Sequence, residues 1–285
     1  MNQVAIKVTK GSSTKRTKLV KLPTSWHGIA DAGERLLLLR MLLTNTGELG
    51  RIIALCRLLG LKRKESNLLQ PEQVRDLLAC LDWLRPVPDA RPLVDVIGKG
   101  KYHLPKEKFS NGTAMEYAIA DEYFGQFAQG DAKALPLLVA TLARPQRRSA
   151  DESARLGDVR IPLHSRSEIE ARAQLIEELP LEQKMVVVLY WAGVKQYVHE
   201  TYAGWIFPTK EELEAEGDEA AQKGDLFGWW GVFMSVAEAN VFGNLEAVHH
   251  ANFHEICMYL VKKKQEAKEA QNRLPSASAP PPSEF

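Results

Sequence analysis

Histidines near the C-terminus have the spacing that comes closest to a metal site. His250 and His254 lie four residues apart, and Glu246 precedes His250 by another four. On one continuous helix such residues share a face, so their side chains could bind one metal ion. The pattern is not H-E-x-x-H, because Ala251 stands where that motif has its catalytic glutamate. We expect His249 on the apolar face of this predicted helix and the other two histidines on its polar face. This distribution of the histidines over two faces indicates that the protein binds no metal ion. A metal-dependent enzyme remains an alternative function.

The short motifs of several enzyme classes do not occur in the sequence. There is no G-x-S-x-G, no G-x-x-x-x-G-K-[ST] and no G-x-G-x-x-G, the patterns that expose a nucleophile or phosphate-binding backbone N–H groups. Lys99-Gly100-Lys101 lacks the series of glycines that a phosphate loop needs. We therefore expect a non-enzymatic protein with no catalytic residues and no cofactor.

Aromatic residues gather in the second half of the chain, where they could form a core or a binding surface. Core packing is the first expectation. Trp229 and Trp230 are adjacent and cannot both face one way on a helix, while Trp205 and Phe207 precede a hydrophilic segment. These four residues are therefore candidates for binding a protein partner.

Charge is segregated along a chain whose formal net charge is only +1. Residues 1–30 carry six basic residues and no acid, and residues 211–219 carry six acidic residues and no base. The segregation indicates either solvated surfaces or sites for partners of opposite charge, self-association included. Lys15, Arg16 and Lys18 are the basic candidates for partner binding. They lack interleaved aromatic residues, so we do not expect a nucleic-acid partner.

Residues 1–30 must position those basic side chains, and their pattern predicts a β-hairpin followed by an exit loop. Val4, Ile6 and Val8 alternate with polar residues, the residues at 11–13 are typical of a turn, and 17–20 could return as a second strand. A lone hairpin is marginally stable. We expect it to dock on the body or on a neighbouring subunit.

From residue 31 the apolar spacing predicts helices. Thr113-x-x-Glu116 and Ser167-x-x-Glu170 have the form of capping boxes. Segment 145–166 contains five arginines and few large apolar residues, which favours a long surface loop. Asp225 could cap a later helix that Gly243 ends. The further helices are expected at 34–43, 49–59, 74–84, from Asp131 to Leu142, at 181–198, and from Asn244 to about Gln271.

The expected fold class is mainly α, a multi-helix globular bundle with a small N-terminal β-hairpin. The helical body spans 31–272, with a subdivision near 86–111 or 145–166, and residues 273–285 have the composition of a disordered tail. Cys56, Cys80 and Cys257 form no C-x-x-C pair and are odd in number, which favours a reducing compartment. No apolar run approaches the roughly 18 residues of a membrane span. We expect no membrane contact and a location in the cytoplasm of a bacterial host cell.

Several short strings occur in an order that resembles an uncharacterised family encoded among the structural genes of tailed phages and prophages. They are KLPTSW at 21–26, YHLP at 102–105, TAMEY at 113–117 with AD at 120–121, LVATL at 138–142 followed by RP at 144–145, HETY at 199–202, GW at 228–229 and VFGN at 241–244. The resemblance covers most of residues 20–265. It implies a role in virion morphogenesis, and tail-assembly chaperones, which attend the tape-measure protein, are the nearest functional analogy.

We therefore expect a tail morphogenesis protein, an assembly chaperone that shields the tape-measure protein or another helical tail protein by helix-in-groove packing. One alternative is a structural virion component of the tail or connector, with the hairpin adding to a neighbour's sheet; its location would be the virion. The other alternative is the metal-dependent enzyme based on Glu246, His250 and His254.

Overall fold

A computed structural model describes residues 2–10, 13–45, 47–61, 65, 69–149, 157–209 and 228–273. These residues form a mainly α-helical fold with an N-terminal β-hairpin, which confirms the expected fold class. The acidic segment 211–219, the predicted cap at Asp225 and the predicted tail from residue 274 lie outside the described residues. So do the side chains of Lys15, Arg16 and Lys18, whose backbone belongs to a strand.

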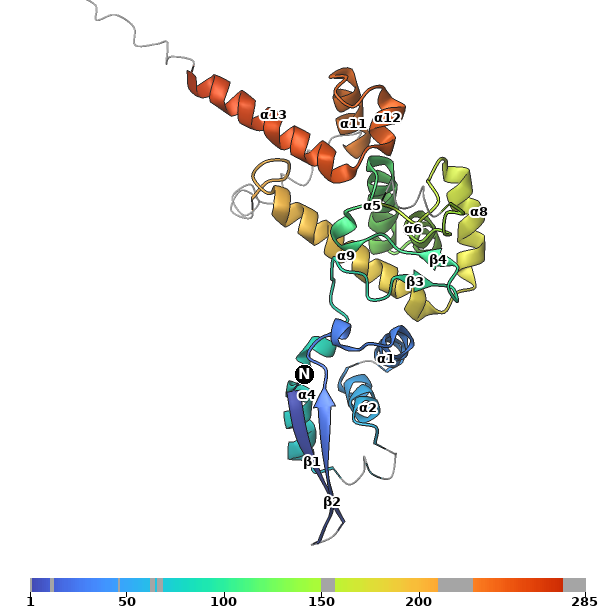
Figure 1. The fold of residues 1–285 in the computed structure, drawn as a ribbon, viewed down its shortest axis with the longest axis vertical. Helices are drawn as coiled ribbons and strands as arrows, with labels where there is room; N and C mark the ends of the chain where they lie inside the picture. The colour runs from blue at the N-terminus through green and yellow to red at the C-terminus, as the bar shows by residue number, and fades with distance from the viewer. Residues whose placement is uncertain are drawn as a thin grey trace, which may run out of the picture.

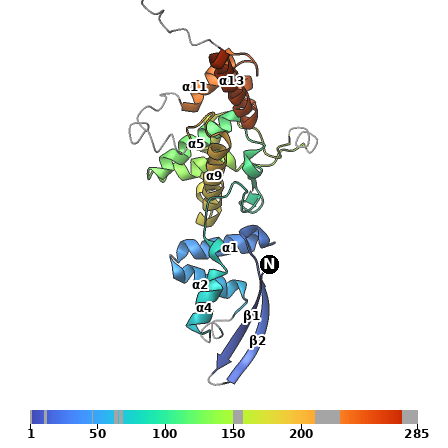
Figure 2. The ribbon, with the colours of Figure 1, turned by 90° about the vertical axis from the view of Figure 1, so that its left-hand side faces the viewer.

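The N-terminal hairpin consists of β1 (Asn2–Lys10) and β2 (Ser13–Leu22), paired antiparallel. Asn2 lies opposite Leu22, and the register shifts after Val8. The hairpin extends beyond the helices, and the end at which Lys10 lies opposite Ser13 forms one extremity of the molecule (Figures 1 and 2). The hairpin is anchored at Leu22, which is buried in a hydrophobic core of the N-terminal residues, and Val20 packs against the same core.

The helices α1 (Ala32–Thr44), α2 (Glu48–Leu58) and α4 (Pro71–Ala79) belong to this N-terminal unit. Asp31 caps α1 by accepting a hydrogen bond from the Gly33 N–H at 2.8 Å. The helix predicted over 74–84 divides, because α4 ends at Ala79 and a 3-10 turn follows at Asp82–Leu84. The N-terminal core comprises Leu22, Ile29, Leu38, Ala54, Leu55, Leu59, Leu77, Leu78, Leu81 and Leu84.

A larger body follows the N-terminal unit. Leu84 is the last residue of the N-terminal core in the sequence. The main core consists of residues from Leu93 onward, together with Leu39 from α1. The connecting chain crosses α9 (Leu181–Tyr202), where the Asp89 N–H donates to the Leu189 carbonyl at 3.3 Å. The expected subdivision near 86–111 or 145–166 stays a prediction.

The body packs α5 (Ala114–Ala128), α6 (Ala134–Leu142), α8 (Arg166–Glu177) and α9 around the main core (Figure 1). Segment 86–111 contains a second small hairpin of β3 (Val96–Ile97) and β4 (Tyr102–His103). The cap predicted at Ser167 is wrong, because Ser165 caps α8 by accepting from the Glu168 N–H at 3.3 Å.

Three helices form the C-terminal part: α11 (Gly228–Glu238), α12 (Leu245–His250) and α13 (Phe253–Arg273). Asn244 caps α12 as predicted, but α11 ends before Gly243. The prediction of one last helix is wrong, because the chain turns between α12 and α13. At the turn the Ala251 carbonyl accepts from the Ala114 N–H at 3.0 Å, and the Asn252 side chain accepts from the His254 N–H at 2.9 Å. No helix in the described ranges is long and apolar enough to cross a membrane.

The crossing of α9 by the connecting chain gives the first prediction. A Cβ atom at Gly193 would lie 2.1 Å from the Asp89 carbonyl carbon and 2.4 Å from the Ala90 nitrogen. Gly193→Ala must therefore displace backbone, and we expect a loss of at least about 2 kcal/mol in the free energy of unfolding by urea denaturation.

Gly125→Ala on α5 is the matched control, because a Cβ atom there meets no heavy atom within 4 Å. It should be neutral or stabilising by up to about 1 kcal/mol, since alanine favours a helix over glycine. Equal stabilities for the two variants would contradict the close approach of this segment to α9.

Candidate functional site

Four charged side chains meet in the interior of the body: Glu116, Arg144, Asp158 and Arg160. Their residues are between 0% and 8% exposed. Arg160 binds Glu116 with both terminal nitrogens, Nη2 lying 3.3 Å from Oε2. It also donates from Nε and Nη2 to the two carboxylate oxygens of Asp158, each at 3.0 Å. Arg144 Nη2 lies 2.9 Å from Glu116 Oε2. We call these four residues the buried ion network.

Local structure explains how Glu116 reaches the centre of the network. The predicted capping box is confirmed: Thr113 Oγ1 accepts from the Glu116 N–H at 3.3 Å, and the Glu116 carboxylate accepts from the Thr113 N–H at 3.4 Å. The cap fixes the glutamate in the first turn of α5, with its second oxygen turned to Arg160. One side chain therefore begins a helix and also compensates buried charge.

Strand-like backbone pairing brings the two arginines together. The Arg147 N–H donates to the Val159 carbonyl at 2.7 Å, and the Ile161 N–H donates to the Pro145 carbonyl at 2.9 Å. Arg144 is also paired with His103 of β4 through bonds of 2.8 and 3.0 Å. The prediction that 145–166 is a surface loop is therefore wrong for Arg160, which is fully buried.

Burial and pairing act on the two arginines differently. Burial disfavours the charged form of Arg160, but Glu116 and Asp158 outweigh this effect and raise its pKa. For Arg144, burial is the largest effect and lowers the pKa to about 10, against the attraction of Glu116 and with further repulsion from Arg160 and Arg172. Arg144 Nε is also buried without a hydrogen-bond partner among the described atoms. Arg144 is therefore the less well compensated of the two cations.

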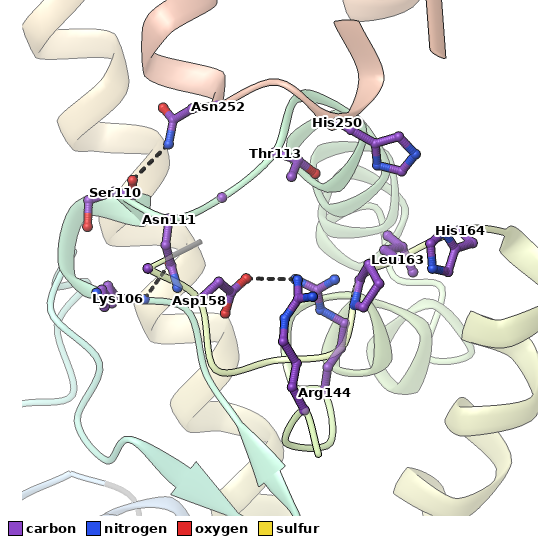
Figure 3. Close-up of a pocket in the computed structure, with 14 residues that line it drawn as sticks. Lys106, Ser110, Asn111, Thr113, Arg144, Asp158, Leu163, His164, His250 and Asn252 are labelled. Carbon is purple, nitrogen blue, oxygen red and sulfur yellow. Dashed lines mark hydrogen bonds and ion pairs between the residues drawn. The ribbon is translucent and has the colours of Figure 1, made fainter. Parts of the chain in front are cut away.

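A pocket of about 530 Å³ lies beside the network (Figure 3). Its rim is fixed by two hydrogen bonds of 2.8 Å, from the Lys106 N–H to Asn111 Oδ1 and from Asn252 Nδ2 to the Ser110 carbonyl. Three parts of the chain line it: the segment before α5, the paired segment between α6 and α8, and the turn between α12 and α13. The lining residues are Lys106, Ser110, Asn111, Gly112, Thr113, Arg144, Arg147, Gly157, Asp158, Pro162, Leu163, His164, His250 and Asn252.

The candidate metal ligands do not come together. Because the helix breaks after His250, Glu246 and His250 lie on α12 while His254 lies on α13. His254 Nε2 is 2.8 Å from the Lys108 carbonyl, which can only accept, so Nε2 carries a proton, and Nδ1 shares a hydrogen bond of 2.9 Å with the Tyr202 hydroxyl. Within the described ranges, no group of three or more His, Cys, Asp or Glu residues could hold a metal ion.

His250 instead lines the pocket, where its ring lies 5.9 Å from that of His164. His249 packs against Trp230, with ring centroids 5.4 Å apart. Partial burial, the largest effect, lowers the pKa of His249. The three histidines thus lie in three separate environments.

The four aromatic candidates for partner binding pack against other parts of the chain and are all half-buried. Trp229 lies 5.1 Å from the Tyr117 ring, whereas Trp230 turns to His249. Phe207 stacks on His199 at 5.1 Å, and Lys268 Nζ lies 4.7 Å from the centre of the Trp205 ring. Their role in partner binding stays a prediction.

Arg144, Asp158 and Arg160 were not predicted as site residues. The available signal was the string Asp158-Val-Arg-Ile161, in which polar and apolar residues alternate as in a strand. Its surroundings are rich in charge, which masks the alternation.

No family model, no curated protein and no solved structure matches the chain. What the pocket binds is therefore inferred from its geometry and charge.

The buried ion network gives the second prediction. Glu116→Gln preserves the shape of the side chain but leaves Arg144 and Arg160 with Asp158 as the one remaining carboxylate of the network. Breaking a buried pair by removing one charge is strongly destabilising, so we expect a loss of about 3–5 kcal/mol in the free energy of unfolding.

Glu122→Gln is its control, because the Glu122–Arg166 pair is exposed, with side-chain exposures of 35% and 47%. Removing an exposed pair should cost less than about 1 kcal/mol. Urea denaturation of both variants would refute the structural role of Glu116 if the two losses were equal.

Proposed function

We propose that this protein is a non-enzymatic tail morphogenesis protein of a phage or prophage, and that it acts as an assembly chaperone for a helical tail protein such as the tape-measure protein. Two things support the proposal. One is the order of short strings along residues 20–265 that resembles the phage family. The other, which carries the binding mode, is a set of exposed apolar side chains on the C-terminal helices and on the segment that joins α11 to α12.

Met234, Val241, Leu245 and Met258 form this set, which we call the C-terminal apolar surface. Val241 and Met258 are each 58% exposed, and Met234 and Leu245 are about 40% exposed. Half-buried aromatic residues adjoin it, because Phe242 packs edge-on against Tyr259 at 5.8 Å. Exposed apolar groups on neighbouring helices are typical of a surface that a partner covers.

The chemistry of this surface suits a helical partner. A tape-measure chain presents apolar stripes before assembly, and an amphipathic helix binds by placing such a stripe against apolar side chains. The two methionines can adapt to different side chains because they are unbranched and polarisable. Beyond Val261 the exposed residues of α13 are mostly charged or polar, so this helix extends from the body as a solvated arm (Figure 1).

The N-terminal hairpin favours the alternative, a structural component of the virion. In the described part of the chain β1 and β2 pair only with each other, so their outer edges remain available to a neighbour's sheet. Mass spectrometry of purified particles separates the two functions. The chaperone is expected in lysates and absent from particles, and its presence at stoichiometric amounts would favour the structural role.

Co-expression with the tape-measure protein of the same genome gives the third prediction. We expect the pair to co-purify and the tape-measure protein to become more soluble. Val241→Glu and Met258→Glu should each weaken the complex by about tenfold or more, because a charge is buried against an apolar helix.

Leu49→Glu on α2 and Leu175→Glu on α8 are the matched controls, since these residues are 59% and 62% exposed but lie far from the C-terminal apolar surface along the chain. They should leave co-purification unchanged. Absence of a complex with the unaltered protein would refute the chaperone role, and equal effects in all four variants would refute the binding surface.

A further inference from the structure

We infer that the pocket beside the buried ion network binds the phosphate group of a small phosphorylated ligand. This inference does not depend on the proposed role in tail assembly. It rests on the charge of the lining, on an unpaired buried donor at Arg144, and on the size of the pocket.

Cations outnumber carboxylates in the described part of the lining. Lys106 and Arg144 contribute positive charges, and Asp158 contributes one carboxylate. Asp158 is already held by Arg160, which does not line the pocket, through three hydrogen bonds of 2.9 to 3.0 Å from its backbone and guanidinium N–H groups. A cationic lining favours an anion, and arginine and lysine are the side chains that bind phosphate oxygens most strongly.

Arg144 supplies a donor that the protein itself does not use. Its residue is 2% exposed, and its Nε has no hydrogen-bond partner among the described atoms. A buried donor without an acceptor costs stability. Figure 3 places this side chain between Asp158 and Leu163 at the pocket. An oxyanion bound here would accept from Arg144 and would offset its repulsion by Arg160 and Arg172.

Neutral donors complete the lining around this cation. Ser110 contributes a hydroxyl group, and Asn111 contributes an amide whose oxygen is engaged by the Lys106 backbone, which leaves its NH2 group to donate. His164 and His250 lie on the opposite side (Figure 3). The dianion of a phosphomonoester offers acceptors only, so this preponderance of donors is complementary to it.

The volume indicates more than a free ion. About 530 Å³ lies within the range of roughly 300–1,000 Å³ typical of sites for organic ligands. The apolar side chains of Pro162 and Leu163 on one wall could contact a carbon skeleton. The ligand class is therefore a phosphomonoester, such as a sugar phosphate.

The test, which is the fourth prediction, is a calorimetric and ³¹P NMR titration of the full chain with inorganic phosphate and with ribose 5-phosphate. Succinate and chloride at matched ionic strength are the comparison ions. We expect both phosphates to bind, the sugar phosphate more tightly, and succinate at least tenfold more weakly. Tighter binding of succinate would overturn the assignment to phosphate, and tighter binding of inorganic phosphate than of the sugar phosphate would overturn the organic ligand.

Variants locate the site. Lys106→Gln should reduce phosphate affinity about tenfold, because it removes one charge-assisted bond at an exposed residue without disturbing the core. Lys101→Gln, an exposed lysine outside the lining, should bind as the unaltered protein does. Arg144→Lys keeps the buried charge but not the guanidinium group, and should weaken binding further than Lys106→Gln while leaving the far-ultraviolet circular dichroism unchanged. If Arg144→Lys does not fold, the phosphate affinities of Lys106→Gln and Lys101→Gln still test the proposal. Equal affinities for these two variants would overturn it.

Discussion

The carboxylate of Glu116 receives two guanidinium groups in the interior of the body, and this contact determines the course of the chain around it. Arg160 lies 44 residues from Glu116 in sequence, and both residues have no exposed area. Neither charge could remain buried without the other, because an isolated ion in a protein interior is far less stable than in water. The segment after α6 must therefore double back along itself, so that Arg144 and Arg160 both reach the first turn of α5.

The main effect of this ion network is to specify one packing of the chain. Its contribution to the free energy of unfolding is secondary. Apolar residues of the same volume could stabilise the body as well or better. The ion network instead disfavours alternative packings, because any shift of α5 against the segment 144–161 separates charges. Arg144 and Asp158 of the network also line the adjoining pocket.

Local patterns predicted much of the fold because the forces behind them act over a few residues. The N-terminal alternation, the capping box at Thr113 and the cap at Asn244 were all confirmed. The burial of Arg160 could not be predicted in this way, since its partners are distant in sequence and its neighbours have the composition of a surface loop. The break after His250 was missed for the same reason. Ala251 and Asn252 leave the helix to form hydrogen bonds with Ala114 and Ser110, which no local pattern reveals.

That break connects the two surfaces for which we propose functions. His250 and Asn252 line the pocket, and the same turn sets the direction in which α13 leaves the body with Met258. The Ala114 N–H, at the beginning of the helix that carries Glu116, donates to the Ala251 carbonyl, so the ion network, the pocket and the C-terminal helices share one rigid junction. On the two proposals above, a ligand in the pocket would contact the turn at which α13 begins. Since coupling between two sites is reciprocal, a partner that shifted α13 would then change the affinity of the pocket by the same factor by which the ligand changes the affinity of the partner.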